Sequence, residues 1–344
     1  MNRGRARVGL VWFVLVAVPL MAAAAPEDFR GQWLLALERG ATVDYGKLAF
    51  ESSPEGMRAY IDGGPVNVIF GRNDSVTVTL DWSDSGDRLH ESLLEGRLSD
   101  GMITGQILEN GARVGTWRAV PEAERTRILK PSKLPPDLLD LSGLWSVGSR
   151  GTHKDTFDLT PEGREVDEAY DPTLDDPHLR CVAGGLIRML DGPFPMEIIP
   201  RQDHLLILFQ YFEEQQRIYT DGRGFPEDLE NTPMGYSIGR WEGSTLVVET
   251  RGLSEAVWDS RGMPISDEAR VIQRLYLDES GNLHNEITLH DPRYYNRPVL
   301  RHAYWTYDPD AGHQEYDCDP HSFYRTLDIE GRLDEYWGRS RTRR

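Results

Sequence analysis

The chain has 344 residues, of which 56 are acidic and 38 are basic, and its formal net charge at pH 7 is −18. Because an acidic chain repels phosphate backbones, neither nucleic acid nor an anionic membrane surface is an expected partner. The length exceeds what one small core requires and predicts two domains.

The first 24 residues have the pattern of a signal peptide. Arg3, Arg5 and Arg7 precede an apolar stretch, and Ala22 to Ala24 offer a cleavage site. The apolar stretch is shorter than the roughly 20 residues that cross a bilayer, which favours a cleaved signal over a membrane anchor. The mature protein is therefore expected to be periplasmic or secreted, without membrane insertion.

Residues 25–120 are predicted to form a small antiparallel β-barrel. Short apolar segments alternate with turn sequences such as Asp100-Gly101 and Asn110-Gly111. Eight short strands in a stretch of this length fit an up-and-down barrel. Gly31-Gln32-Trp33 resembles the Gly-x-Trp opening of lipocalin-like (calycin-like) barrels. The predicted strands are 32–37, 47–51, 57–61, 66–70, 75–82, 93–98, 103–108 and 115–120.

Residues 121–140 are a charged, proline-bearing linker, and residues 141–344 are predicted to form a larger antiparallel β domain with loops. The pattern from Leu141 to Trp145 repeats that from Phe29 to Trp33, which fits two related barrels or two independent strand openings. Thr160 before a proline predicts a short helix over 161–170. The whole chain is thus predicted to be mainly β, with two lipocalin-like barrels. Strands are predicted at 196–199, 204–212, 216–221, 237–241, 245–250, 269–278, 282–290, 299–307 and 313–317.

The most distinctive stretch, residues 217–250, reads RIYTDGRGFPEDLENTPMGYSIGRWEGSTLVVET. The sequence YTDGR followed by GYSIGRWEGSTLVVET resembles a motif of a large, uncharacterised family of secreted bacterial hypothetical proteins. The resemblance extends from about Asp171 to about Cys318. It implies kinship and no established activity. A His-Ser or His-Thr pair that is common in such proteins is replaced here by Ile265-Ser266.

Alternation within this stretch places Arg217, Tyr219 and Asp221 on one face of a strand. Because the preceding strand is apolar on both faces, this face is predicted to be buried or to line a pocket. Arg223 follows in the turn. A second polar face carries His284, Glu286, Thr288 and His290, and its part from His284 to Thr288 is predicted to face solvent.

Two classes of function remain open. The first is a binding protein that holds a small, partly apolar ligand in the second domain. The second is a hydrolase or isomerase that uses Asp221 with Glu286 or His290 for acid–base catalysis. An Arg–carboxylate network that only stabilises the fold, or a structural envelope protein, are the alternatives. Binding is favoured because no nucleophile motif and no cofactor motif is found. The candidate ligand-binding residues are Glu197, Arg217, Tyr219, Arg223, Trp241 and Glu249.

Cys181 and Cys318 are the two cysteines of the chain, and export predicts a disulfide between them. Such a bond would stabilise the fold by roughly 5 kcal/mol in the chain-entropy description. The alternative is a metal site, since Cys318 and His321 form a C-x-x-H pair. No second pair completes a tetrahedral set, so neither a metal nor a cofactor is expected.

Overall fold

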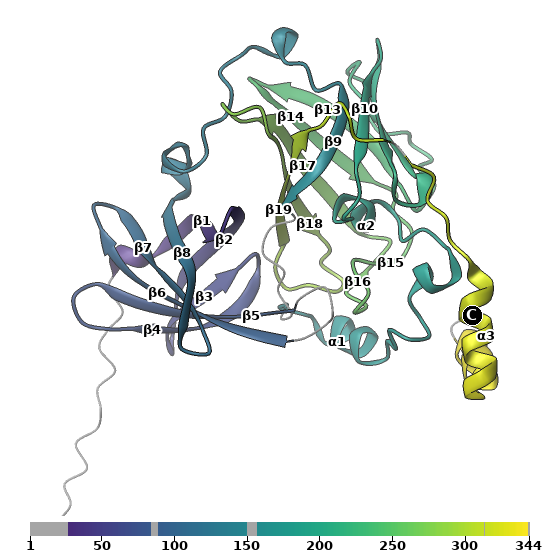
Figure 1. Ribbon diagram of the computed structural model, residues 1–344, viewed down its shortest axis with the longest axis horizontal. Coiled ribbons are helices and arrows are strands. Elements are labelled where there is room, and N and C mark those ends of the chain that lie inside the picture. The colour runs from purple at the N-terminus through teal and green to yellow at the C-terminus, as the bar shows by residue number, and fades with distance from the viewer. Residues whose placement is uncertain (1–26, 84–88, 150–156, 313, 343–344) are drawn as a thin grey trace, which may run out of the picture.

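The computed structural model describes residues 27–83, 89–149, 157–312 and 314–342. Figure 1 shows two β-barrels side by side, with the N-terminal barrel on the left and the C-terminal barrel on the right. Both barrels are closed. The prediction of a mainly β protein with two barrels is confirmed.

The N-terminal barrel contains eight antiparallel strands in chain order, and β1 pairs with β8 to close it. All eight predicted strands are present, and most are longer than predicted because their ends continue into tight turns. Two of these turns contain Asp100 and Asn110 in the left-handed conformation. The strands are β1 (Gly31–Arg39), β2 (Thr42–Ser53), β3 (Gly56–Ile61), β4 (Gly64–Phe70), β5 (Ser75–Ser83), β6 (Leu89–Ser99), β7 (Met102–Glu109) and β8 (Ala112–Pro121).

Aromatic side chains fill the N-terminal barrel. A short 3₁₀ helix, η1 (Glu27–Phe29), inserts the fully buried Phe29, whose carbonyl accepts a 2.8 Å hydrogen bond from Trp33 Nε1. The Trp117 ring covers two paired glycines, Gly96 and Gly105, where an added Cβ would lie 2.5 Å from the indole. Glycine at these positions therefore makes room for a buried indole.

The C-terminal barrel has nine strands, and β9 closes it by pairing with both β10 and β19. The pair β12–β13 is parallel, which differs from the predicted antiparallel arrangement, because residues 220–235 cross the barrel end instead of forming a tight turn. The strands are β9 (Gly143–Ser149), β10 (Met196–Pro200), β11 (His204–Phe209), β12 (Gln215–Tyr219), β13 (Tyr236–Glu242), β14 (Thr245–Arg251), β17 (Arg270–Leu277), β18 (Leu283–His290) and β19 (Val299–Tyr307). A separate two-stranded sheet pairs β15 (Ala256–Val257) with β16 (Pro264–Ile265).

Short helices accompany the two barrels, and one of them, α2 (Leu186–Leu190), is buried in the core of the C-terminal barrel. The predicted helix is present as α1 (Pro161–Glu168), and Thr160 Oγ1 caps it by accepting from Gly163 N at 3.0 Å. The predicted strand 313–317 is wrong, since residues 314–317 run as irregular chain into α3 (Pro320–Glu330). The other helices are α2 (Leu186–Leu190), α4 (Leu333–Thr342), η2 (Glu122–Arg127), η3 (Pro136–Leu138), η4 (Pro177–Arg180) and η5 (Tyr211–Glu213). None of the helices in the described ranges is long and apolar enough to cross a membrane.

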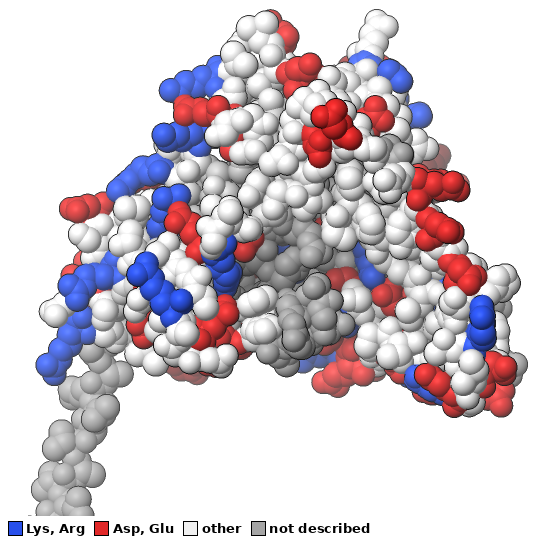
Figure 2. Space-filling model, in the orientation of Figure 1, with Lys and Arg blue, Asp and Glu red and all other residues white. Residues whose placement is uncertain are grey.

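The two barrels meet through a polar junction where β2 packs against β19 and β9. The Tyr45 ring stacks on His302 with centroids 5.1 Å apart, and Asp62 O accepts from Leu300 N at 3.2 Å. On the visible face, basic side chains lie mainly over the N-terminal barrel and the segment after it, while acidic side chains predominate over the C-terminal half (Figure 2). Across the junction itself, the backbone hydrogen bond between Leu300 and Asp62 and the ion pair between Arg297 and Glu51 join the two barrels.

Candidate functional site

The polar face of β12 points away from the barrel interior. Arg217 is exposed, and Asp221 forms an exposed 2.6 Å ion pair with Arg223. Gln216 and Ile218, on either side of Arg217, are buried. The alternation was predicted correctly, but the burial of the Arg217 face was wrong, because an apolar neighbouring strand does not reveal which face of β12 is covered. Tyr219 is half-buried by stacking on Tyr236 at 5.0 Å.

The polar face of β18 is buried under the N-terminal barrel, so the prediction that it faces solvent was wrong. Alternation marks this face as outward, and it cannot indicate that a second domain covers it. Glu286 accepts a 2.8 Å hydrogen bond from Tyr276 and is paired with Arg125. Burial opposes its ionisation, but the His302 ring and the Arg125 guanidinium outweigh burial and lower the pKa of Glu286 to about 2.

The predicted site residues therefore do not form one site. β12 and β18 are separated by three strands in the nine-strand barrel, and their polar faces both point outward, so Asp221 and Glu286 lie on separate surfaces. His290 lies on the same face as Glu286 but at the end of β18, where burial and Arg270 lower its pKa.

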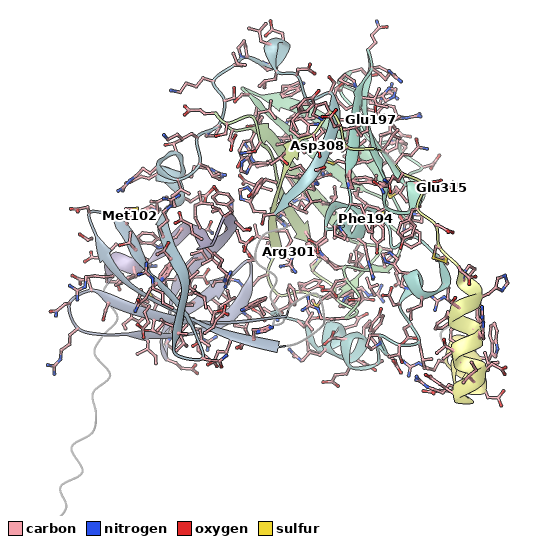
Figure 3. All side chains as sticks on the ribbon, viewed as in Figure 1. Met102, Phe194, Glu197, Arg301, Asp308 and Glu315 are labelled. Carbon is pink, nitrogen blue, oxygen red and sulfur yellow. A yellow bond between two sulfur atoms is a disulfide. The ribbon has the colours of Figure 1, made fainter. Side chains whose placement is uncertain are left out.

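The remaining predicted ligand-binding residues are also dispersed. Glu197 lies on the outward face of β10 (Figure 3). Glu249 is outward on β14 and pairs with Arg251 at 2.6 Å. Trp241 is partly buried and packs on the core of the C-terminal barrel. Glu197 and Glu249 thus lie on the outer face of the barrel wall, whereas Trp241 packs against its interior.

A different group of polar side chains includes Arg188 of α2, and we call Tyr170, His178, Arg188 and Trp258 the Arg188 cluster. Arg188 and Trp258 are buried, and Tyr170 and His178 are half-buried. All five residues of α2 are buried, including Arg188, which is 8% exposed. Arg188 Nη2 donates to Asp176 Oδ2 at 2.9 Å, and the other oxygen of Asp176 accepts from His178 N. A buried cation is thus fixed by one carboxylate that also caps η4.

Two glycines before α2 allow this close packing. An added Cβ at Gly184 would lie 2.8 Å from Arg188 Cδ and 3.0 Å from His178 Nε2. Gly185 has φ +83°, and an added Cβ there would meet Pro233 O at 2.7 Å. The sequence Gly184-Gly185 therefore brings the Arg188 side chain and the His178 ring against the same stretch of backbone.

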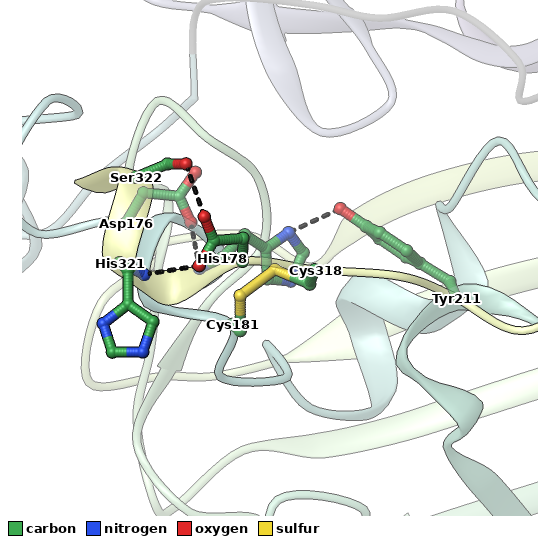
Figure 4. The surroundings of a disulfide bond; sticks show 8 residues. Asp176, His178, Cys181, Tyr211, Cys318, His321 and Ser322 are labelled. Carbon is green, nitrogen blue, oxygen red and sulfur yellow. Dashed lines mark hydrogen bonds between the residues drawn. A yellow bond between two sulfur atoms is a disulfide. The ribbon is translucent and has the colours of Figure 1, made fainter.

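His178 is held as a neutral ring. Its Nδ1 lies 2.5 Å from the Tyr211 hydroxyl (Figure 4), and Phe212 packs on the ring with centroids 4.5 Å apart. Burial, assisted by the charge of Arg188, lowers the pKa of His178 to about 3. Burial likewise raises the pKa of Tyr211 to about 12. Phe212 has a left-handed φ of 57°, a conformation that is unusual for a bulky residue and concentrates at functional sites.

The predicted disulfide is confirmed and lies next to this cluster. Cys181 ends η4 three residues after His178 and bonds to Cys318, with the Cα atoms 5.8 Å apart (Figure 4). The bond ties the η4 segment to the chain that enters α3. A cysteine in a disulfide is not a thiolate ligand, and the described residues contain no group of three metal-ligating side chains.

The other side of the cluster comes from the segment after β15. Trp258 is 2% exposed, and the guanidinium of Arg301, from the inner face of β19, lies 5.4 Å from its ring centroid. Burial raises the pKa of the adjacent Asp259, although Arg301 and Arg188 oppose this effect. The Tyr170 ring packs directly on Gly262, where no Cβ would fit. Burial raises the pKa of Tyr170 above its usual range.

Four polar atoms of the cluster are enclosed and have no hydrogen-bond partner among the described residues. They are Tyr170 Oη, His178 Nε2, Arg188 Nη1 and Trp258 Nε1. Arginine and tryptophan can only donate, tyrosine can donate, and His178 Nε2 carries a proton when Nδ1 accepts from Tyr211. Burying unpaired donors costs free energy, so this concentration of donors fits a site for an acceptor-rich group.

A second polar layer lies inside the same barrel. Gln216 Nε2 donates to Gln273 Oε1 at 2.8 Å across the lumen and to Ser237 Oγ at 3.1 Å. The register aligns Gln273 with Ile287 and Ile287 with Arg301, so Gln273 and Arg301 lie at one level of the barrel wall. The polar layer formed by Gln216 and Gln273 therefore extends through Arg301 to Trp258 of the Arg188 cluster.

Sequence reasoning did not identify the Arg188 cluster. Its residues come from the irregular segment 171–195, from η5 and from a loop, where no periodicity marks a face. One signal was present: the DPHLRC and GGLIR segments combine charges with paired glycines and a cysteine. In hindsight, an Asp, a His and an Arg beside the predicted disulfide indicated a fixed polar site.

Comparison with known proteins does not name a function. No protein-family model matches the chain, and no curated protein is detectably similar. Its fold was matched to a crystal structure from Nostoc punctiforme, a protein of unknown function from the DUF3598 family. The match covers 81% of this chain and 97% of that chain, at 10% sequence identity and a TM-score of 0.24. A TM-score this low is not evidence of a shared fold or a shared function.

Proposed function

We propose that the C-terminal barrel binds a small molecule that has an oxygen acceptor group, such as a carboxylate, attached to an apolar body. The four enclosed, unpartnered donors of the Arg188 cluster are the observation that carries this proposal. An acceptor group would pair with Arg188 Nη1 and neighbouring donors, and charge-assisted hydrogen bonds are the strongest such contacts. The apolar residues of α2, which belong to the barrel core, suit an aliphatic body.

The test compares two buried tyrosines. Tyr170→Phe removes a hydroxyl with no partner among the described residues, so the ligand-free protein should keep or gain stability. Tyr295→Phe is the matched control, because that hydroxyl donates to Pro264 O at 2.8 Å and its loss should cost about 0.5–1.5 kcal/mol.

Ligand binding is measured with hexanoate as the probe and hexanol as its uncharged counterpart. Hexanoate should raise the unfolding temperature of the wild-type protein saturably and more than hexanol does. Tyr170→Phe and Trp258→Phe should weaken this effect, whereas Tyr295→Phe should retain it after allowance for its lower stability. Equal responses to hexanoate and hexanol in every variant would refute an acceptor-binding site.

An acid–base enzyme is the second candidate, favoured by one observation. In the same buried region the pKa of His178 is lowered to about 3 and that of Asp259 is raised. Both groups interact with the charge of Arg188, and pKa values displaced in opposite directions within one site are a pattern of catalytic acid–base pairs. Hydrolysis of p-nitrophenyl hexanoate that His178→Gln abolishes would support catalysis, and a rate unaffected by that change would exclude His178 as a catalytic base.

We also propose that the protein is exported and acts in the periplasm or outside the cell. The signal-like residues 1–24, which lie outside the described residues, and the Cys181–Cys318 disulfide support this location. Mass spectrometry of the mature protein should find an N-terminus near Ala25. Recovery of protein with an intact Met1 from a membrane fraction would contradict the proposal.

A further inference from the structure

A small cavity lies between the barrels, separate from the Arg188 cluster. Its volume is about 190 Å³, and its polar lining consists of Gln32, Lys47 and Tyr60 from the N-terminal barrel with Thr288 and Arg297 from the C-terminal half. Drug-sized ligands occupy roughly 300–1,000 Å³, whereas one water occupies about 30 Å³. The cavity therefore suits a few waters or a small ion.

Arg297 lines this cavity, and its guanidinium is bound by a carboxylate and an aromatic ring. Its Nη1 and Nη2 donate to the two oxygens of Glu51 at 2.9 and 2.5 Å, and its guanidinium lies 3.9 Å from the Tyr60 ring centroid. Nε is enclosed and has no partner among the described residues. The carboxylate that neutralises Arg297 belongs to Glu51, which is not part of the cavity lining.

Lys47 is also incompletely engaged. Its ammonium nitrogen lies 3.5 Å from Glu122 and 4.0 Å from Glu286, beyond the range of a strong N–H···O hydrogen bond. Glu286 is already occupied by Arg125 and Tyr276. Of the ten residues described as lining the cavity, Lys47 and Arg297 are the two that carry a charge at neutral pH, and both are cations.

We infer that this cavity binds a small oxyanion, such as a phosphate or a short carboxylate, between Lys47 and Arg297. The Thr288 hydroxyl supplies a neutral donor in the same lining. Gly63 keeps the walls close, since an added Cβ there would lie 2.2 Å from Pro298 O. Because the walls come from both halves of the chain, the bound anion bridges the barrel junction.

The inference is tested by titrating phosphate and acetate in separate arms at constant ionic strength, with sodium chloride as the balancing salt. At least one anion should raise the unfolding temperature saturably, and the arm that responds identifies phosphate or carboxylate chemistry. Lys47→Gln should lower the affinity for the anion that stabilises the wild type about tenfold or more, as expected for loss of a charged hydrogen bond. Lys130→Gln, at an exposed lysine in the connecting segment, is the matched control and should behave as wild type. Equal responses in all three proteins, or no response in the wild type, would overturn the inference.

A direct measurement covers the case in which Lys47→Gln disturbs folding. Crystals grown with selenate should show an anomalous selenium peak inside the cavity that Lys47 and Arg297 line. Thr288→Val, which keeps the side-chain shape, should reduce the affinity for the responding anion while leaving the unfolding temperature without anion nearly unchanged. The absence of a selenium peak in the cavity of these crystals would contradict the proposal.

Discussion

The interiors of the two barrels are filled by different kinds of side chain. The N-terminal barrel is packed with apolar side chains from Phe29 and Trp33 to Trp117. The C-terminal barrel places Gln216, Gln273 and Arg301 on its inner face. A barrel that needed only stability would have no use for buried amides and charges, since burying them costs free energy unless every group is paired. The difference agrees with the proposal that the C-terminal barrel binds the ligand, while the N-terminal barrel supports it.

The largest expected loss of stability comes from truncating a large side chain in the core of the N-terminal barrel. Trp117→Ala removes a side chain that is 1% exposed and leaves a cavity over Gly96 and Gly105. It should lower the free energy of unfolding by about 3–5 kcal/mol, measured by chemical denaturation. A loss below about 1 kcal/mol would mean that this interior is not close-packed, and the comparison of the two barrels would fail.

Breaking the buried ion pair between Arg188 and Asp176 in the C-terminal domain should cost a similar or slightly smaller amount of stability. Asp176→Asn leaves the guanidinium of Arg188 buried without a counter-charge, which typically costs about 3–5 kcal/mol. The double change Asp176→Leu with Arg188→Met should recover most of this loss and should abolish the response to hexanoate. Recovery of stability with the hexanoate response intact would show that the pair is only structural.

Stability should also depend on pH through a buried histidine of the C-terminal barrel. Burial lowers the pKa of His302 to about 3, so the folded state keeps this ring neutral while the unfolded chain protonates near pH 6.5. Stability is therefore complete above pH 6.5 and falls as the pH drops, by up to about 1.4 kcal/mol per pH unit. His302→Phe should flatten the slope measured between pH 6.5 and 5, and His321→Gln, at an exposed position, should not.

The smallest effect is expected at the outer face of β12. Asp221 and Arg223 pair in solvent, where ion pairs contribute little. Asp221→Asn should leave the denaturation midpoint and hexanoate binding at wild-type values. A clear loss of either would show that this surface has a role that its exposure does not reveal.

The sequence predicts the barrels better than it predicts the site, and particular residues show why. Turns such as Asp100-Gly101 are local, so the eight N-terminal strands follow from short-range patterns. Burial of Glu286 depends on Arg125, which lies 161 residues away in the chain, and no period within β18 encodes that contact. Arg188 and His178 come together through glycine-dependent packing in irregular chain, where neither period 2 nor period 3.6 applies. The disulfide was predictable because two cysteines allow one pairing.

The way each barrel closes has a consequence for the order in which the chain folds. The N-terminal barrel is complete once Pro121 can pair with Trp33. The C-terminal barrel closes only when β9 pairs with β19, and its paired residues Trp145 and Tyr307 are 162 positions apart in the chain. Long-range closure is slow because the loop entropy must be overcome before the contacts form. The N-terminal barrel can thus be finished first, and its strand β2 then offers a preformed surface on which the last strands, β18 and β19, assemble their buried histidines.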